Sequence, residues 1–255
     1  MYNMIFKRKS FHLFRDNKTR IYFNENNHLT NEELEDIYKA FKTFIPLIKD
    51  IKVEIKIVQN NLTTCKRGQE YCILFYSEKK DNYLQNIGYL GEQLDFYLVS
   101  KNIGTLWFGV GKTELLKYNE LDFVTMMAIG KVPENMFRKD MFKSKRKPLE
   151  EIWEGSKYLM IANIVRFTPS SCNTQPWFVK EDNHQLSVYR YRKPGKRGIM
   201  PVDKVVYQNL IDIGIFIYFL GLCLNNYNIN HSIEVFSDNE QNDAELTLSA
   251  IVKFI

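Results

Sequence analysis

The spacing of apolar residues along the chain predicts several amphipathic or buried helices. Thr30 followed by Glu33 has the form of a capping box, in which each side chain satisfies a backbone N–H group at a helix start. Apolar residues then recur from Leu34 to Ile45 at the helical period. Further helices are predicted over Asn82–Lys101, Thr113–Leu116, Leu149–Ile164 and the strongly apolar Tyr207–Asn225.

Short apolar runs between these helices predict strands. Val53–Val58 alternates apolar and charged positions, as a strand with one buried face does. Tyr71–Tyr76 is apolar throughout, which is typical of a strand buried on both faces. Gly104–Gly111 combines a strand with a glycine-rich turn, and further strands are predicted over Val124–Ile129, Leu186–Tyr191, Ser232–Phe236 and Leu246–Phe254.

Two of the predicted helices resemble each other. Asn86-Ile87-Gly88 opens one long apolar run and Asp212-Ile213-Gly214 opens another, at a separation close to half the chain length. The echo favours two related halves rather than a short-period repeat. We expect these halves at 1–148 and 149–255, packed together as one unit.

Composition excludes several classes of function. A chain of 255 residues buries one large core or two small ones. Its net charge of +5 is too small to indicate nucleic-acid binding by itself. The start of the chain lacks the apolar region of a signal peptide, and the longest apolar run, Ile211–Leu224, is too short to span a bilayer. We therefore expect a cytoplasmic protein with no membrane or nucleic-acid partner.

The cysteines predict neither a metal site nor a disulfide framework. No C-x-x-C pair occurs and no histidine lies at zinc-ligand spacing. They are interpreted as reduced thiols of an intracellular protein, and they are Cys65, Cys72, Cys172 and Cys223.

The stretch Pro169–Trp177, here called the serine loop, carries the most specific signal. It reads Pro-Ser-Ser-Cys-Asn-Thr-Gln-Pro-Trp, a polar loop stiffened by proline at both ends. It resembles the flavin-contacting loop of the nitroreductase family, P-S-S-x-N-x-Q-P-W, at every specified offset. The resemblance implies FMN contacts from Pro169, Ser170, Ser171, Asn173 and Gln175. The alternative is a well-capped turn with a packed tryptophan.

Arg8–Phe14, here called the cationic segment, resembles the family's N-terminal R-x-S-x-[KR]-x-[FY] pattern. The resemblance implies that Arg8, Lys9, Ser10 and His12 meet the phosphate, ribityl chain and pyrimidine edge of the flavin. Arginine offers a planar fork for phosphate. His12 departs from the family's usual lysine or arginine, so a neutral imidazole there supplies less positive field to a reduced flavin.

Two further segments match the family. Gly91–Gly111 resembles the helix, strand and turn beside the isoalloxazine ring, which implies flavin contacts from Trp107, Phe108 and Gly109. Lys143–Glu151, here called the Lys-Arg segment, resembles the family's K-x-R-K-P-L-E-E ending, which implies that Ser144, Lys145 and Arg146 lie at the FMN phosphate. The alternative for its cations is a solvated charge run.

The order of the motifs resembles the double-length, pseudo-dimeric branch of the family, because the serine loop follows the Lys-Arg segment. The implied fold is α+β and nitroreductase-like, with mostly antiparallel central sheets flanked by helices and two halves intertwined as an internal pseudo-dimer. The implied site takes its cationic segment, glycine turn and Lys-Arg segment from the first half and its serine loop from the second. One complete FMN site per chain, one degenerate site and a monomer are expected, with further dimerisation left open.

The implied chemistry is hydride transfer from NADH or NADPH to the flavin, and then to a small-molecule electron acceptor such as a nitroaromatic or quinone. The flavin carries the chemistry, so no catalytic side chain is required, and Cys172 is interpreted as a bystander. One alternative is a protein that stores or senses FMN without efficient turnover. Another is a nucleic-acid-binding module using Arg190–Arg197 and Lys143–Lys147, which no recognised motif supports.

Overall fold

The computed structural model describes residues 1–255 except 26, 194, 196 and 239–244. The chain forms two compact units. The first unit holds residues 1, 3–80 and 93–141, and the second holds residues 2, 81–92 and 142–255. These units differ from the expected halves at residues 81–92 and 142–148, and the division into related halves stays a prediction.

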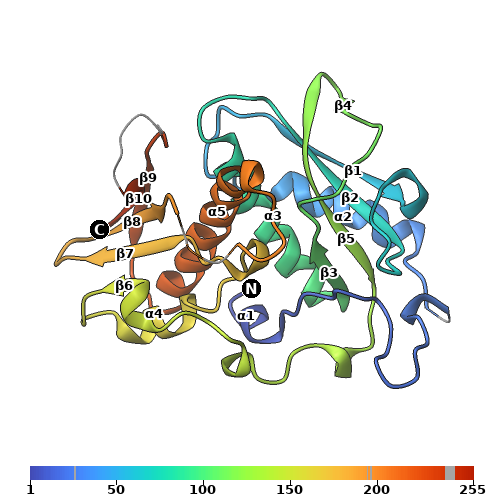
Figure 1. The fold of residues 1–255 in the computed structure, drawn as a ribbon, viewed down its shortest axis with the longest axis horizontal. Helices are drawn as coiled ribbons and strands as arrows, with labels where there is room; N and C mark the ends of the chain where they lie inside the picture. Colours follow the sequence, from blue (N-terminus) through green and yellow to red (C-terminus); the bar gives the residue numbers. More distant parts are fainter. Residues whose placement is uncertain (26, 194, 196, 239–244) are drawn as a thin grey trace. The chain divides into compact units, whose positions relative to one another are not determined.

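The first unit is built on an antiparallel sheet with the strand order β1-β2-β5-β3 (Figure 1). Its strands are β1 (Val53–Gln59), β2 (Tyr71–Ser77), β3 (Ile103–Trp107) and β5 (Leu121–Lys131), and the two-residue β4 (Lys117–Tyr118) pairs with β5. β2 lies between two neighbours and is almost wholly buried, which explains its continuous apolar sequence.

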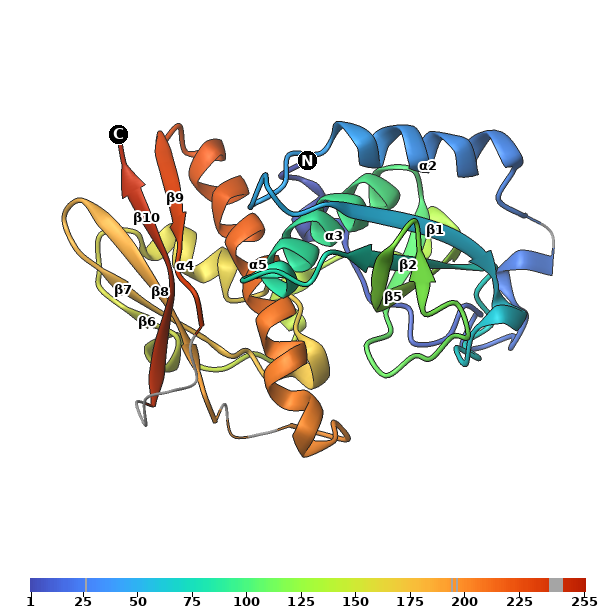
Figure 2. The ribbon, with the colours of Figure 1, turned by 90° about the horizontal axis from the view of Figure 1, so that it is seen from above.

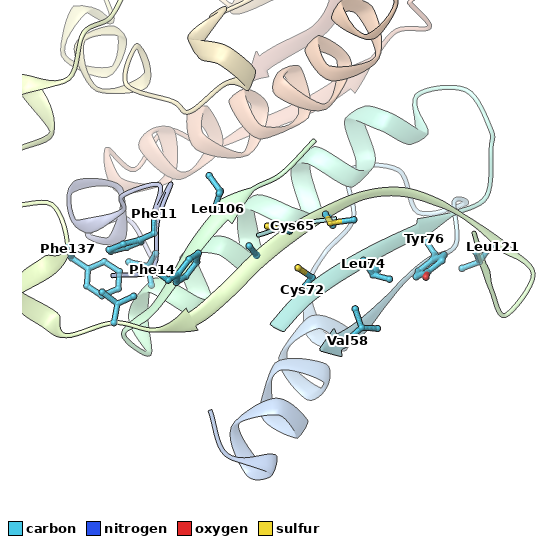
Figure 3. Close-up of a cluster of buried hydrophobic side chains, with 14 residues drawn as sticks. Phe11, Phe14, Val58, Cys65, Cys72, Leu74, Tyr76, Leu106, Leu121 and Phe137 are labelled. Carbon is cyan, nitrogen blue, oxygen red and sulfur yellow. The ribbon is translucent and has the colours of Figure 1, made fainter. Parts of the chain in front are cut away.

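The N-terminal residues complete the core of the first unit. After the short helix α1 (Met4–Lys7), Phe11 and Phe14 pack into a buried cluster with side chains such as Leu74 and Leu106 (Figure 3). A Cβ atom at Gly104 would collide with Phe11, so the bare backbone of β3 lets the cationic segment lie against it.

The second unit is built on a sheet with the strand order β6-β7-β8-β10-β9. Its strands are β6 (Trp153–Glu154), β7 (Trp177–Glu181), β8 (Gln185–Tyr191), β9 (His231–Val235) and β10 (Leu246–Phe254). Only the β6–β7 pairing is parallel among the described strands of this sheet. Figure 2 shows α5 (Val202–Asn226) running along this sheet, and Trp177 stacks on Phe216 of α5 with ring centroids 4.8 Å apart.

Two glycines bring helices into backbone contact inside the second unit. α3 (Tyr83–Ser100) contributes residues 83–92 to this unit. A Cβ at Gly88 would collide with the carbonyl of Ile211 on α5, and a Cβ at Gly214 would collide with the carbonyl of Gln85 on α3. Because each glycine meets the residue three positions before the other, the contact is reciprocal, as an isologous interface is.

Two series of elements along the chain have the same order and the same strand pairing. α2 (Asn31–Thr43), β1, β2, α3, β3 and β5 follow in the same sequence order as α4 (Leu159–Val165), β7, β8, α5, β9 and β10. The corresponding strands also take the same places in their sheets, β1-β2-β5-β3 and β7-β8-β10-β9, with antiparallel pairing throughout. The sequence echo between the two long helices therefore falls on equivalent elements.

Most predicted elements are confirmed, including the α+β class. α2 begins with the predicted capping box, since the Thr30 side chain accepts from the Glu33 N–H group and the Glu33 side chain binds the Thr30 N–H group. α5 starts at Val202, five positions before the predicted start at Tyr207. β7 was not predicted, because it follows directly on the polar serine loop.

The predicted helix over Leu149–Ile164 is wrong in its first half. A short 3-10 turn at Leu149–Glu151 and strand β6 precede α4, which begins at Leu159. Gly155 has a φ of +138°, which interrupts any helix. The Glu181 carboxylate fixes the interruption by accepting from the Trp153 indole and the Lys157 N–H group.

The predicted helix over Thr113–Leu116 is also wrong. Thr113 forms an isolated antiparallel bridge with Thr63, and its hydroxyl donates to the Leu62 carbonyl at 3.0 Å. Because Thr113 is held in an extended bridge to a distant loop, the segment does not form the i to i−4 hydrogen bonds of a helix.

α5 is the one described helix that is long and apolar enough to cross a membrane by length and composition. Of its most apolar stretch, 67% is buried inside the structure. This is weak evidence for a membrane span, because the core helix of a soluble protein has the same properties.

Candidate functional site

A buried ion pair orients the cationic segment in the first unit. The Arg8 Nε atom donates to Asp95 Oδ2 at 2.8 Å, and both side chains are buried. The other Asp95 oxygen accepts from the Thr105 hydroxyl on β3 at 2.7 Å. Arg8 also donates to the Ser10 hydroxyl at 3.3 Å. The first predicted phosphate ligand is thus tied to a carboxylate on α3.

Further cations lie close to Arg8. Burial, followed by the Arg138 charge, lowers the pKa of Lys9, and burial, followed by the Arg8 charge, lowers the pKa of Arg138. The Lys9 ammonium donates to the Met136 carbonyl at 2.9 Å. A cluster of neighbouring cations favours binding of an anion. Arg138 was not among the predicted residues.

The surroundings of His12 favour its neutral imidazole. Partial burial, and then the charges of Arg67 and Arg8, lower the pKa of this imidazole. The His12 side chain is exposed. The expectation of a weaker positive field at this position agrees with the lowered pKa.

The structure brings the cationic segment and the glycine turn together on β3. Ser10 forms a parallel bridge with Thr105, and the Phe11 N–H group donates to the Thr105 carbonyl at 2.9 Å. Two residues further along, Trp107 stacks on Phe75 with centroids 5.6 Å apart. A turn over the next residues is closed by a bond of 2.9 Å from the Gly111 N–H group to the Phe108 carbonyl.

The serine loop of the second unit has an unusual backbone. Cys172, Asn173 and Gln175 have positive φ values of 50°, 56° and 47°. Residues with side chains adopt this left-handed conformation at a cost of about 1 kcal/mol each. The Ser170 hydroxyl closes the loop by accepting from the Gln175 N–H group at 2.9 Å. Such a backbone requires anchors elsewhere in the fold.

α5 supplies the first anchor of the serine loop. Asp212 Oδ1 accepts from the Ser171 N–H group at 2.9 Å and from the Ser171 hydroxyl at 3.2 Å. The Thr174 hydroxyl lies 3.1 Å from Asn209 Oδ1 and 3.5 Å from Asp212 Oδ2. Burial raises the pKa of Asp212 to about 7, against the hydrogen bonds from Ser171 and Thr174, which lower it.

The Lys-Arg segment supplies the second anchor. Arg146 donates to Asn173 Oδ1 at 3.0 Å and to the Phe167 carbonyl at 3.2 Å. The Lys147 N–H group donates to Gln175 Oε1 at 2.9 Å. The Lys-Arg segment and the serine loop are therefore hydrogen-bonded to each other within the second unit.

The predicted site residues fall into two sets, one in each unit. The first unit brings together Arg8, Lys9, Ser10, His12, Trp107, Phe108 and Gly109. The second unit brings together Ser144, Lys145, Arg146, Pro169, Ser170, Ser171, Asn173 and Gln175. Sequence reasoning missed Asp95 and Asp212, two acidic residues inside apolar helices whose partners lie on other elements.

The alternative nucleic-acid surface loses one of its cations. Arg190 is fully buried and forms two hydrogen bonds with Asp238, of 2.6 and 2.9 Å. Two members of the basic loop 190–197, Pro194 and Lys196, lie outside the described residues.

Helices and antiparallel sheets of this topology, with clustered cations, hydroxyls and amides, define a protein of the nitroreductase type. The sequence matches the family described as "Putative TM nitroreductase" over residues 1–223, and the chain belongs to this family. Membership supports a general oxidoreductase role.

One solved structure shares the fold over nearly the whole chain. A "putative nitroreductase" of Thermotoga maritima MSB8 has a TM-score of 0.61 at 17% identity, over 99% of this chain and 92% of that one. A "Putative NADH dehydrogenase/NAD(P)H nitroreductase" of Parabacteroides distasonis ATCC 8503 has a TM-score of 0.43 at 13% identity, over 60% of this chain and 96% of that one. No curated protein sequence matches the chain.

Proposed function

We propose that the protein is an FMN-dependent oxidoreductase that passes hydride from NADH or NADPH, through the flavin, to a nitroaromatic, a quinone or a similar acceptor. The observation that carries the proposal is the serine loop, which keeps the family's polar residues and is fixed by Arg146 and Lys147. Family membership over residues 1–223 supports the same reading.

The donor chemistry of the second unit fits a phosphorylated flavin. The Lys145 ammonium is exposed and forms no ion pair in the described part of the chain. Ser144 precedes it in sequence, and the Asn173 amide donates to the Lys145 carbonyl at 3.2 Å. We propose that Lys145 and Arg146 bind the FMN phosphate and that the serine loop offers amide and hydroxyl groups to the flavin.

The donors of the first unit divide into two roles. Asp95 holds the Arg8 Nε atom, so Arg8 orients the cationic segment. Lys9, next to Arg138, and the Ser10 hydroxyl, which accepts from Arg8 and keeps its own proton to donate, are the groups we propose to meet the flavin. Trp107, Phe108 and Gly109 provide apolar and backbone surface on the same strand edge.

Bound FMN would supply the hydride-transfer chemistry itself. The residues of the chain would bind and orient the flavin. No described side chain is required as nucleophile or base, and Cys172 has no histidine among its recorded partners.

A second function has its own observation. His12, whose pKa is lowered by burial and by the charges of Arg67 and Arg8, stands where the family usually carries a cation, and an imidazole without charge stabilises a reduced, anionic flavin less. This favours a protein that stores or senses FMN without efficient turnover.

The internal repeat extends the proposal to the whole chain. The matching topology of the two halves supports a monomer built as an internal pseudo-dimer. The cationic segment has a family match only near the N-terminus, so we propose one complete FMN site per chain. A cytoplasmic location and a small-molecule acceptor complete the proposal.

The test is the visible spectrum of the purified protein with and without added FMN, followed by NADH and NADPH oxidation with nitroaromatic and quinone acceptors. We expect one flavin per chain and acceptor-dependent turnover. Flavin binding without turnover on any acceptor would favour storage, and failure to bind flavin would reject both functions.

A matched pair of variants locates the site. Lys145→Gln is expected to weaken FMN binding several-fold, because it removes an exposed cation beside the serine loop. Lys204→Gln removes an exposed lysine on α5 and is expected to leave the affinity unchanged. Equal effects of the two variants would contradict the placement of the phosphate.

A further inference from the structure

The serine loop is held by a carboxylate that has no cation. Asp212 is 1% exposed, and its Oδ1 and Oδ2 atoms face only loop donors, the Ser171 N–H group, the Ser171 hydroxyl and the Thr174 hydroxyl. Burying an ionised carboxylate without a cation costs free energy, which the hydrogen bonds that it accepts must offset. What it holds here is a loop with three left-handed residues.

A neutral Asp212 carboxyl would give the Thr174 hydroxyl one donor and one acceptor. The Thr174 hydroxyl has one proton and lies closer to Asn209 Oδ1, at 3.1 Å, than to Asp212 Oδ2, at 3.5 Å. A proton on Oδ2 would donate to Thr174, which would donate to Asn209, while Oδ1 accepts from Ser171. The ionised form leaves Thr174 with two acceptors for a single proton.

We propose that Asp212 is a positioning residue, which holds the serine loop in its left-handed conformation through Ser171 and Thr174 and thereby sets the affinity of the loop for the flavin. This inference rests on the proposed function only in its last step, the effect on flavin binding. Asp212 does not touch the flavin in this proposal, and it acts through the loop.

Neighbouring charges do not account for the state of Asp212. Burial is the cause that raises its pKa to about 7, and the remaining causes are hydrogen bonds from Ser171 and Thr174, which lower it. The titratable groups on the surrounding elements do not shift the pKa of Asp212. These groups are Cys172 in the loop, Arg146 and Lys147 before it, Arg166 after α4, and Tyr83, Tyr89 and Glu92 on α3.

The direction of the pH effect follows from linkage. When the loop is closed, Asp212 is buried and its pKa is raised to about 7. When the loop opens, water reaches the carboxyl and its pKa falls towards the usual value near 4. The closed loop therefore binds more protons between these values, so closing is favoured as pH falls below about 7 and is weakened, by up to about tenfold per pH unit, as pH rises through that window.

Asp212→Asn imitates the neutral carboxyl. Its amide oxygen would accept from Ser171 and its NH₂ group would donate to Thr174. The variant therefore keeps the closed loop and loses the titration. Asp203→Asn, at an exposed position in the first turn of the same helix, is the matched control.

The loop carries its own reporter. Cys172 is exposed at its tip, whereas Cys65, Cys72 and Cys223 are buried. In the full chain without flavin, a pH-insensitive fluorescent maleimide on Cys172 would report loop mobility by anisotropy from pH 5.5 to 8.5. We expect anisotropy to fall as pH rises in the wild type and in Asp203→Asn, and to stay high and constant in Asp212→Asn.

A wild-type profile that is flat, or a transition that persists in Asp212→Asn, would overturn the proposal. Should Asp212→Asn fail to fold, Thr174→Val decides: it removes the hydroxyl between Asp212 and Asn209 and should give low anisotropy already at pH 5.5. A Thr174→Val profile equal to that of the wild type would also contradict the anchor.

Unlabelled protein tests the last step. The FMN dissociation constant should rise several-fold from pH 6 to pH 8 in the wild type relative to Asp212→Asn. A pH-dependent loop with no FMN binding would leave the anchor intact and reject the proposed function. FMN binding with the same pH dependence in both proteins would reject the link between anchor and affinity.

Discussion

α3 and α5 occupy equivalent places in the two halves, and each carries one buried aspartate that holds a candidate binding segment. Asp95 on α3 binds a guanidinium, that of Arg8, together with the Thr105 hydroxyl. Asp212 on α5 binds only neutral donors, from Ser171 and Thr174. Each aspartate therefore holds a candidate binding segment, but Asp95 is paired with a cation and Asp212 is not.

The difference shows that the charge of its partner determines whether a buried carboxylate responds to pH. A cation at 2.8 Å offsets the cost of burying the Asp95 charge, so this contact is a fixed structural tie. Neutral donors offset less of the cost at Asp212, and burial raises its pKa to about 7. The serine loop is thus expected to respond to pH.

The largest effect is expected at the ion pair. Asp95→Ala removes the carboxylate that Arg8 and Thr105 bind, and breaking a buried pair by removing one partner costs about 3 kcal/mol or more. Chemical denaturation measures the loss. Asp36→Ala breaks an exposed pair with Lys39 and should cost less than about 0.5 kcal/mol. A similar small loss at Asp95 would mean that the pair is not a structural tie.

A smaller effect tests the equivalence of the two helices. Gly214→Ala places a methyl group against the Gln85 backbone, and Gly88→Ala places one against that of Ile211. Each should destabilise the fold by about 2 kcal/mol, since backbone cannot move aside as a side chain does.

Gly221→Ala on α5 is the control for the glycine pair. Its Cβ would meet only His231, at 3.6 Å, an ordinary contact. It should be neutral or slightly stabilising because alanine is the better helix former. Thermal unfolding compares all three variants, and a loss at Gly214 without one at Gly88 would break the reciprocity.

The smallest effect sharpens the contrast in pH response. The folded-state pKa of Asp212 is raised, so its contribution to stability is present at low pH and is lost as pH rises towards about 7. Asp212→Asn does not titrate. Its unfolding free energy should therefore increase relative to wild type by about 1 kcal/mol per pH unit from pH 5 to 7 and level off above. Denaturation of both proteins across this range measures the difference, and a constant offset would contradict the raised pKa.

Much of the fold could be predicted because its signals are local. The Thr30 and Glu33 capping box and the apolar run of β2 each specify their own element. The helix predicted over Leu149–Ile164 failed because its sequence does not reveal Glu181, which binds the interruption from a distant strand. Likewise, Thr113 is drawn into an extended bridge by Thr63, fifty positions earlier.

In the candidate site, too, the residues of a local pattern could be predicted and those that depend on distant contacts could not. The serine loop and its partner Arg146 were predictable because a family pattern fixes their offsets, and the structure joins Arg146 to Asn173. The anchors Asp95 and Asp212 were not predicted, since each depends on a contact across the fold. Ser171, a predicted flavin contact, and Thr174, which was not predicted, both form hydrogen bonds with α5.

FMN titration of the purified chain, followed by visible absorbance and centrifugal separation of bound from free flavin, tests the central claim most directly. We predict saturation at one FMN per chain, with affinity reduced several-fold by Lys145→Gln and unchanged by Lys204→Gln. A colourless protein that retains no FMN at saturating concentrations, or one that binds it equally in both variants, would contradict the account.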